Sequence, residues 1–305
     1  MIETALRLAA FDWLRQQRLV QGETLPRTLL ERGFPYKGEF VTLVGASGIW
    51  KPRQLATMPI SITTTTESSY DDGFDEDGLL IYRYRGSDPN HRDNKGLREA
   101  AQTRTPLIYF HAAIPGWYVP VWPVFVIQNH PELLYCVAAV DPAYASATEL
   151  SKFADQYQVP DKDSLLGVRK YVMAYTKQRL HQSAFRERVI SAYNEHCALC
   201  ALRHRSLLDA AHIIPDSEAG GEPVVPNGLS LCKIHHAAYD QNILGVSPDF
   251  EITVREDVLR EHDGPMLRYG LQQLHGGHLI LPHARSNWPD RDRLDTRYQR
   301  FLQAS

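Results

Sequence analysis

The pattern of hydrophobic and polar positions changes within the first half of the chain, from helical spacing to short apolar runs. Residues 1–32 have apolar side chains at helical spacing, with Pro26 opening a second short helix. From about residue 40 to 140, short apolar runs are separated by Gly, Pro, Asp and Asn. These runs predict strands at 41–44, 60–63, 79–84, 106–110, 117–122, 125–127 and 133–140. A mostly antiparallel, barrel-like sheet is expected, interrupted by one helix near 94–103.

The second half predicts a different organisation. Residues 141–170 suggest a helical or loose connection, and 168–196 form a long amphipathic helical pattern. A strand is expected at 207–214 and a helix over 229–239, and the chain ends in an apolar run at 277–282 and a charged helix. With 305 residues the chain can bury two cores. We expect an α+β protein with a front domain over 1–145, a linker or helix over 146–180, and a rear domain with a C-terminal extension over 181–305.

A CxxC pair and a later CxxH pair supply one set of metal ligands. They are Cys197, Cys200, Cys232 and His235. Structural zinc takes four such ligands in a tetrahedron, so these residues predict a zinc site. The alternative is ordinary buried thiols. A disulfide is not expected, because no secretory signal is recognisable.

A second set of polar residues lies between and beside these pairs. His212 falls on the predicted strand, and His236 and Asp240 are four residues apart on the predicted helix. That spacing places them on one helix face, close enough to share a cation. The alternative is that His212 is a core histidine and that His236 only flanks the zinc site.

A strand with histidine, a loop with asparagine and a helix with histidine resemble the HNH (ββα-metal) nuclease family over about residues 185–255. The resemblance implies that His212 is the general base, that Asn227 fixes the base or the loop, and that His236 and Asp240 bind a catalytic Mg²⁺ or Mn²⁺. The family often has Asp or His where this chain has Ala211. Asp209 shares that strand face, because side chains alternate with period two, and we expect it to replace the missing ligand.

The front half contains Ser69-Tyr-Asp-Asp-Gly73, Leu80-Ile-Tyr-Arg-Tyr-Arg-Gly86 and Asn94-Lys95. These segments resemble the SRA (SET- and RING-associated) domain, an SRA/PUA-like β-barrel that flips a modified cytosine out of DNA. The resemblance implies a base pocket that supplies stacking rings and polar partners for the flipped base. Its members would be the rings of Tyr70 and Tyr84, a carboxylate of Asp72 or Asp71, and the backbone amides of Arg85 and Gly86, with Trp50 and Tyr82 as alternative stacking partners.

Charge and hydropathy restrict the function classes. The net charge of −3 argues against tight, indiscriminate binding of nucleic acid, which depends on neutralising many phosphates. No apolar run approaches the length of a membrane helix, so we expect a cytoplasmic protein without membrane contact.

Together these patterns predict a modification-dependent restriction endonuclease with structural zinc. Its partner would be double-stranded DNA carrying 5-methyl- or 5-hydroxymethylcytosine, and cutting both strands with one site per chain implies a homodimer. Two alternatives remain open. One is an HNH nuclease with a different target, and the other is a non-catalytic zinc-containing DNA-binding protein.

Overall fold

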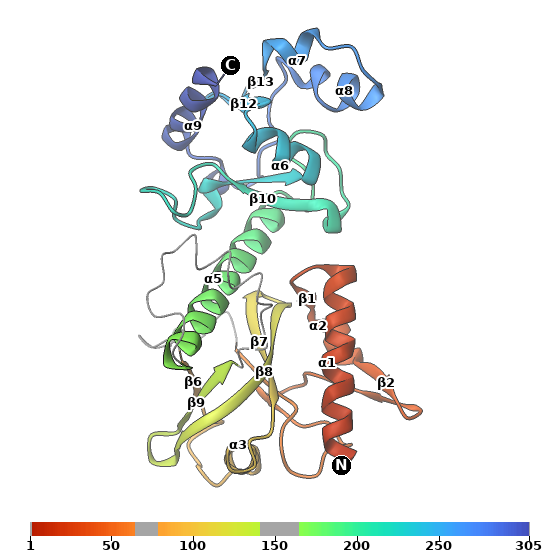
Figure 1. Cartoon of the computed structure of the whole chain (residues 1–305), viewed down its shortest axis with the longest axis vertical. Helices are drawn as coiled ribbons and strands as arrows, with labels where there is room; N and C mark the ends of the chain where they lie inside the picture. Colours follow the sequence, from red (N-terminus) through yellow and green to blue (C-terminus); the bar gives the residue numbers. More distant parts are fainter. Residues whose placement is uncertain (1, 65–78, 141–164, 305) are drawn as a thin grey trace. The chain divides into compact units, whose positions relative to one another are not determined.

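The computed structural model describes residues 2–64, 79–140 and 165–304 (Figure 1). The chain divides into two compact units, Met1–Ser183 and Ala184–Ser305. The boundary falls within the long helix α5 (Leu165–Ala192). Each unit combines helices with β-sheet, so the α+β class is confirmed.

The front unit begins with helices and short strands and continues into its main sheet. Before the sheet's long strands come α1 (Ile2–Gln21), β1 (Leu25–Pro26), α2 (Arg27–Arg32), β2 (Phe34–Tyr36), β3 (Glu39–Val41), β4 (Ile49–Trp50), β5 (Ser61–Thr63), β6 (Leu80–Arg83) and α3 (Arg92–Gln102). They are followed by β7 (Leu107–Ile114), β8 (Trp117–His130), the 3₁₀ turn η1 (Pro131–Leu133) and β9 (Tyr135–Val140). The two strands expected at 117–122 and 125–127 are one strand, β8.

The main sheet has the strand order β4-β5-β7-β8-β9-β6, with β1 paired to β8. All its pairs are antiparallel except β5 with β7. Among the described residues, β4 and β6 end the sheet without pairing to each other, so the expected closed barrel is not confirmed. A side chain links the end strand β6 to β5, the strand next to the other end, because the Tyr82 hydroxyl donates to the Thr63 carbonyl at 3.2 Å.

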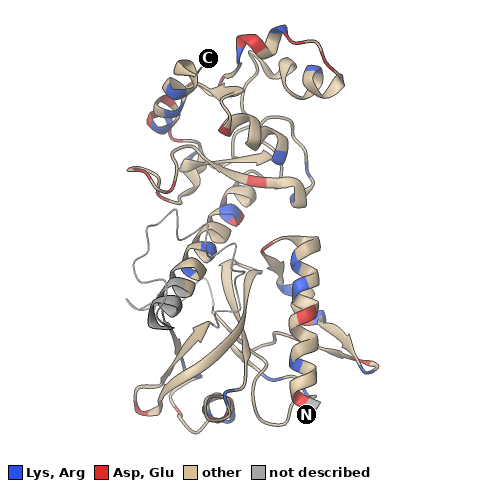
Figure 2. Ribbon diagram, in the orientation of Figure 1, with Lys and Arg blue, Asp and Glu red and all other residues tan. Residues whose placement is uncertain are grey.

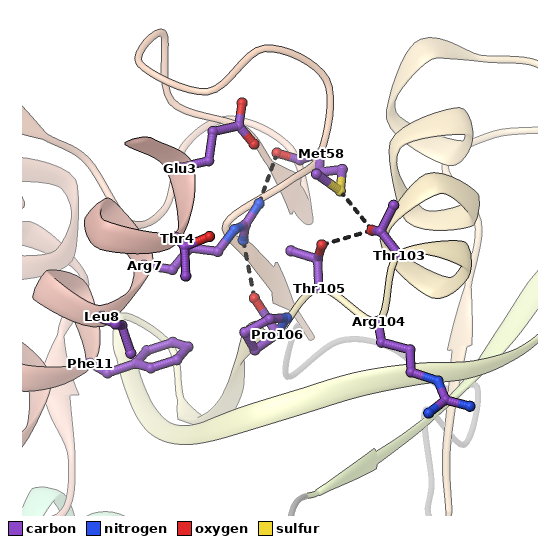
Figure 3. A pocket seen from close by; sticks show the side chains of 10 residues that line it. All are labelled: Glu3, Thr4, Arg7, Leu8, Phe11, Met58, Thr103, Arg104, Thr105 and Pro106. Atoms are coloured by element: carbon purple, nitrogen blue, oxygen red, sulfur yellow. Dashed lines mark hydrogen bonds between the residues drawn. The ribbon is translucent and has the colours of Figure 1, made fainter. Parts of the chain in front are cut away.

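Helix α1 packs on this unit through one face. Leu6, Ala10 and Leu14 repeat every four residues and are buried with residues of β7 and β8, as helical periodicity requires. Arg7 lies on the same face and is only 2% exposed. Its guanidinium donates to the Pro59 carbonyl at 2.7 Å. It also donates to the Pro106 carbonyl at 3.1 Å, beside a cavity of about 260 Å³ (Figure 3). A buried charge therefore ties the helix to two loops.

The rear unit contains two short antiparallel hairpins and several helices. After α5 the elements are η3 (Arg205–Leu207), β10 (Leu208–His212), η4 (Val225–Asn227), β11 (Gly228–Cys232), α6 (Lys233–Asp240), β12 (Leu244–Val246), β13 (Ile252–Val254), α7 (Glu256–Arg260), α8 (Pro265–Gly270), η5 (Gln272–Leu274), η6 (Arg285–Asn287) and α9 (Arg291–Gln303).

One expectation for this unit was wrong. Residues 229–232 are not the start of a helix but belong to the strand β11, which pairs along its whole length with β10. All five residues of β11 are buried, and a short apolar run cannot be distinguished from a buried helix by periodicity alone. The apolar run at 277–282 makes one isolated bridge, Glu251 with His278.

Among the described residues, none of the helices combines the length and the apolar character that crossing a bilayer requires.

Candidate active site

The β10–β11 hairpin and the helix α6 that follows it carry the chemistry of the rear unit. Leu208 pairs with Cys232 and His212 with Gly228, so the hairpin places the candidate base at one end and a cysteine at the other. Helix α6 starts directly after Cys232 and packs back on β10. One ββα unit, formed by β10, β11 and α6, therefore brings together residues from Asp209 to Asp240.

The four predicted zinc ligands come together. The ligand atoms of Cys197, Cys200, Cys232 and His235 all lie within 4.8 Å of one another. Nδ1 of His235 faces the sulfurs of Cys197 and Cys232, at 3.4 and 3.3 Å. Its other nitrogen, Nε2, lies 2.7 Å from the Gly270 carbonyl. A carbonyl that fixes the second ring nitrogen is the usual support of a metal-bound histidine.

The electrostatics of this cluster also fit a cation. The hydrogen bond with Cys197 is the main cause that lowers the pKa of Cys232 well below its ordinary value, and the same neighbour raises the pKa of Cys200. The sulfurs are thus close enough to compete for protons. A bound metal replaces those protons with one central charge, and three thiolates with one imidazole are a standard zinc set.

His236, the next residue of α6, lies between two carboxylates. Its Nδ1 is 3.5 Å from an Asp209 oxygen, and its Nε2 is 3.4 Å from an Asp240 oxygen. The hydrogen bond with Asp209 raises the pKa of His236 above its ordinary value. Burial acts to raise the pKa of Asp209, but the contact with His236 outweighs it and the net shift is downward.

His212 occupies the end of β10, and its ring stacks on Phe185 of α5 with centroids 4.1 Å apart. The Nε2 atom is buried and has no hydrogen-bond partner among the described residues. Burial lowers the pKa of His212, and the nearby Asp216 carboxylate opposes that shift. Because its pKa is below the ordinary value, the ring is neutral near pH 7, which is the form that accepts a proton.

Asn227 is fully buried and contacts main chain only. Its amide oxygen accepts from Ile214 N at 2.9 Å, and its amide nitrogen donates to the carbonyls of Ile214 at 3.0 Å and Glu222 at 3.1 Å. These bonds join the two ends of the loop that follows His212. Asn227 therefore holds the loop in place.

Ala211 is fully buried in the core of the rear unit. Asp209, two residues earlier, is the β10 side chain that contacts α6 through His236. His212 is three residues after Asp209 and contacts α5, so the strand presents the two groups to different helices, as period-two alternation requires.

Sequence reasoning did not single out two further groups near the site. One is Asp216, whose charge acts on His212. The other is an ion cluster behind Asp209, in which Arg186 and Arg205 both bind the fully buried Glu187. The position of Asp216 four residues after the candidate base was a usable signal. No sequence pattern predicted the ion cluster, because its members lie on two separate elements, α5 and η3.

The predicted base pocket falls partly outside the described residues, since Tyr70, Asp71 and Asp72 belong to 65–78. Tyr84 is 6% exposed, and its hydroxyl donates to Asn129 at 2.9 Å. The Arg85 amide donates to the Asn94 side chain at 2.9 Å, and Gly86 follows with a left-handed φ of 62°. The Arg85 amide is therefore already engaged within the protein.

The two alternative stacking residues are also packed. Tyr82 is buried, and the ring of Trp50 lies so close to Gly45 that a Cβ there would come within 2.0 Å of it. The Trp50 ring nitrogen donates to Thr42. Both rings are therefore packed inside the front unit.

Charged residues of both signs are interspersed along each unit (Figure 2). This distribution agrees with the small net charge of −3. Helix α5 carries a basic run at Lys177, Arg179, Arg186 and Arg188. Arg179 pairs with Glu23 and Arg186 with Glu187, so part of that run is neutralised by internal partners.

Comparisons with known proteins agree with this geometry in the rear unit. Residues 197–247 match the family model described as HNH endonuclease, so the chain carries an HNH endonuclease domain. A search of curated proteins finds no match.

Two solved structures are similar at low sequence identity. One, titled a modification-dependent TagI restriction endonuclease, is 15% identical, with 94% of this chain and 89% of that chain covered and a TM-score of 0.32. The other is titled the Type IV phosphorothioation-dependent restriction endonuclease ScoMcrA, and is 14% identical over 58% of this chain and 52% of that chain, with a TM-score of 0.22. TM-scores of this size do not establish a shared overall fold.

Proposed function

We propose that this HNH-domain protein is a modification-dependent DNA endonuclease that hydrolyses phosphodiester bonds in double-stranded DNA carrying modified cytosine. The observation that carries the nuclease part is the placement of His236 between Asp209 and Asp240, beside His212 and within the segment that matches the HNH family. A zinc scaffold alone does not require this second cluster.

His212 acts as the general base. It is neutral at physiological pH because burial lowers its pKa, and its Nε2 has no partner in the described protein. An unpaired buried nitrogen costs roughly 1–3 kcal/mol when it serves packing alone. In this role the neutral ring takes the proton from the water that attacks the phosphate. Asn227 holds the loop after the base in place through its three main-chain bonds.

The donor set around His236 fits a divalent cation. The carboxylates of Asp209 and Asp240 suit Mg²⁺ or Mn²⁺, the imidazole is a donor that borderline transition metals also accept, and the neighbouring thiolate cluster suits Zn²⁺. The residues that would hold the catalytic ion are His236 with Asp240 or Asp209. When bound, such an ion neutralises charge on the phosphate and stabilises the leaving oxygen.

The front unit supplies recognition in this proposal. Its support is the resemblance of residues 40–145 to SRA domains, in which Tyr70, Tyr84 and Asp72 or Asp71 would hold a flipped 5-methyl- or 5-hydroxymethylcytosine. The small net charge agrees, since specificity then comes from a pocket and not from general attraction to phosphate. Cleavage of both strands with one site per chain calls for a homodimer.

A second candidate is an HNH endonuclease with a different target. The burial of Tyr84, the engaged amide of Arg85 and the packed rings of Tyr82 and Trp50 favour it, because each of these four groups already has a partner inside the protein.

The test uses the full-length chain, Mg²⁺ or Mn²⁺, and matched plasmids that differ only in cytosine modification. We expect cutting of modified plasmid only, and none by His212→Ala. Equal cutting of both plasmids would select the second candidate. Absence of cutting with retained DNA binding would favour a non-catalytic zinc-containing DNA-binding protein.

A further inference from the structure

The two carboxylates at His236 face different nitrogens of one imidazole ring. Asp209 faces Nδ1 and Asp240 faces Nε2. A histidine that binds a metal uses one ring nitrogen and donates a hydrogen bond from the other, commonly to a carboxylate. One of the two aspartates therefore shares the ion with His236, and the other orients the ring.

Asp209 is held by the protein on its far side. Its Oδ1 accepts from the Ala210 amide at 2.9 Å and lies 3.6 Å from Nε of Arg186. Arg186 is fixed in turn, because it donates to the Leu208 carbonyl at 2.7 Å and to Glu187 at 2.6 Å.

Glu187 has no exposed side-chain surface, and Arg205 binds its other oxygen. A buried carboxylate with two guanidinium partners forms a fixed support, since moving either arginine leaves one of the two buried carboxylate oxygens without its charged partner. The chain of contacts runs from Glu187 through Arg186 to Asp209 and then to Nδ1 of His236.

Asp240 has the opposite surroundings. Its side chain is 56% exposed, against 36% for Asp209. Among the described residues, His236 is its one ion-pair partner. Its oxygens are therefore accessible to an ion and to a substrate phosphate, whereas the cation of Arg186 beside Asp209 repels a second positive charge there.

From this asymmetry we infer that Nε2 of His236 and Asp240 form the ion-binding pair, and that Asp209 is a positioning residue that orients His236 through Nδ1, supported by Arg186 and Glu187. The inference rests on the proposed nuclease function and decides which of the two carboxylates meets the ion. It also gives Asp209 a different role from that of the ligand missing at Ala211.

Crystals of the zinc-loaded full-length protein soaked with Mn²⁺ test the assignment directly. We expect anomalous density within coordination distance of His236 Nε2 and an Asp240 oxygen, with Asp209 hydrogen-bonded to Nδ1. Density at Nδ1 and Asp209 would overturn the inference and leave the nuclease proposal intact. Absence of Mn²⁺ from both nitrogens, with no cleavage activity, would overturn both.

Calorimetric titration with Mn²⁺ gives a readout in solution. We expect Asp240→Asn to abolish measurable binding and Asp209→Asn to weaken it by about 10- to 100-fold, the usual effect of removing an orienting partner. Arg186→Lys keeps a charge for Glu187 but loses the planar contact with Asp209, so it weakens binding in the same direction. Thermal unfolding verifies that each variant folds.

The double variant separates positioning from a general loss of structure. Because Arg186 acts through Asp209, the variant with both Asp209→Asn and Arg186→Lys should bind Mn²⁺ no more weakly than Asp209→Asn alone. Effects that multiply would show that Arg186 does not act through Asp209 and would overturn the proposed chain of contacts. Arg188→Lys is the matched control, since Arg188 lies on the same helix and donates to the Pro223 carbonyl; it should leave Mn²⁺ affinity unchanged.

Discussion

The two units of this chain differ in how far apart in the sequence their interacting residues lie. In the rear unit, the predicted zinc ligands, the candidate base and the candidate ion ligands all lie between Cys197 and Asp240, on one hairpin, the helix that follows it and the turn that precedes it. In the front unit, the main sheet pairs strands distant in sequence, such as β5 with β7 and β1 with β8. Local chemistry can be read from spacing, whereas a pocket in a sheet of long-range pairs cannot.

The largest expected effect contrasts two cysteines, one from each unit. Cys232→Ala removes a predicted zinc ligand and should unfold the rear unit. Structural zinc contributes about 10–16 kcal/mol of apparent binding free energy in small zinc domains, which is as large as the whole free energy of unfolding of a typical domain. Calorimetry should lose one of two unfolding transitions, and metal analysis should show that zinc is lost.

The matched control is Cys136→Ala in the front sheet. Cys136 is fully buried, and burial raises the pKa of its thiol to about 12. The Cys136→Ala variant should retain zinc and the unfolding transition of the rear unit. Loss of zinc from the Cys136 variant, or its retention in the Cys232 variant, would contradict the assignment of the cluster.

The second contrast concerns buried charge in the front unit. Arg7→Met should lower the free energy of unfolding of that unit by about 2–4 kcal/mol, because it leaves the carbonyls of Pro59 and Pro106 buried without donors. Denaturant titration of Arg7→Met measures the change. Arg15→Met on the exposed side of the same helix should change stability by less than about 0.5 kcal/mol. Equal effects of the two substitutions would show that the buried hydrogen bonds of Arg7 contribute nothing.

The third prediction concerns the pH dependence of cleavage. His212 must be neutral to accept a proton, and burial lowers its pKa below the ordinary value of about 6.5. Activity should therefore stay constant as pH falls through 6.5 and then decline about tenfold per pH unit below the folded-state pKa. Initial cleavage rates against pH, at saturating divalent ion, measure this limb.

Asp216→Asn sharpens the same test. The Asp216 carboxylate raises the pKa of His212, so its removal should move the acid limb to still lower pH. An acid limb above 6.5 in the wild type, or one that Asp216→Asn leaves in place, would argue against His212 as the base.

The smallest expected effect tests the use of Tyr84. Tyr84→Phe removes the hydrogen bond to Asn129 and should lower front-unit stability by about 1 kcal/mol. The ring face remains, so any preference for modified DNA should be unchanged. Fluorescence-monitored unfolding and competition binding provide the two readouts, with the exposed Tyr269 changed to Phe as control. A lost preference at unchanged stability would assign the hydroxyl to DNA and not to packing.

The HNH part of the sequence prediction is confirmed because its signal is local. Ligand pairs at CxxC and CxxH spacing, and His236 with Asp240 at helical spacing, are fixed by backbone geometry over a few residues. The helix start was misplaced at 229 because the residues of β11 are buried on both faces and lack alternation.

What the sequence could not provide depends on distant contacts. Nothing in the sequence around Asp209 indicates that Arg186 lies behind it or that Glu187 is fully buried. The front sheet had most of its strands predicted, but its edges and its order depend on pairings across long loops. The SRA-like base pocket remains a prediction, since Tyr70, Asp71 and Asp72 lie outside the described residues.

The Cys3His cluster also encloses the candidate catalytic residues along the chain. Cys200 and Cys232 bracket the segment that contains His212 and Asn227, and His236 follows the last residue of the cluster directly. A metal ion bound by the four residues would join the two ends of that segment and so reduce the number of conformations open to it in the unfolded chain. Zinc binding at the cluster would therefore favour the folded arrangement of the candidate base without touching it.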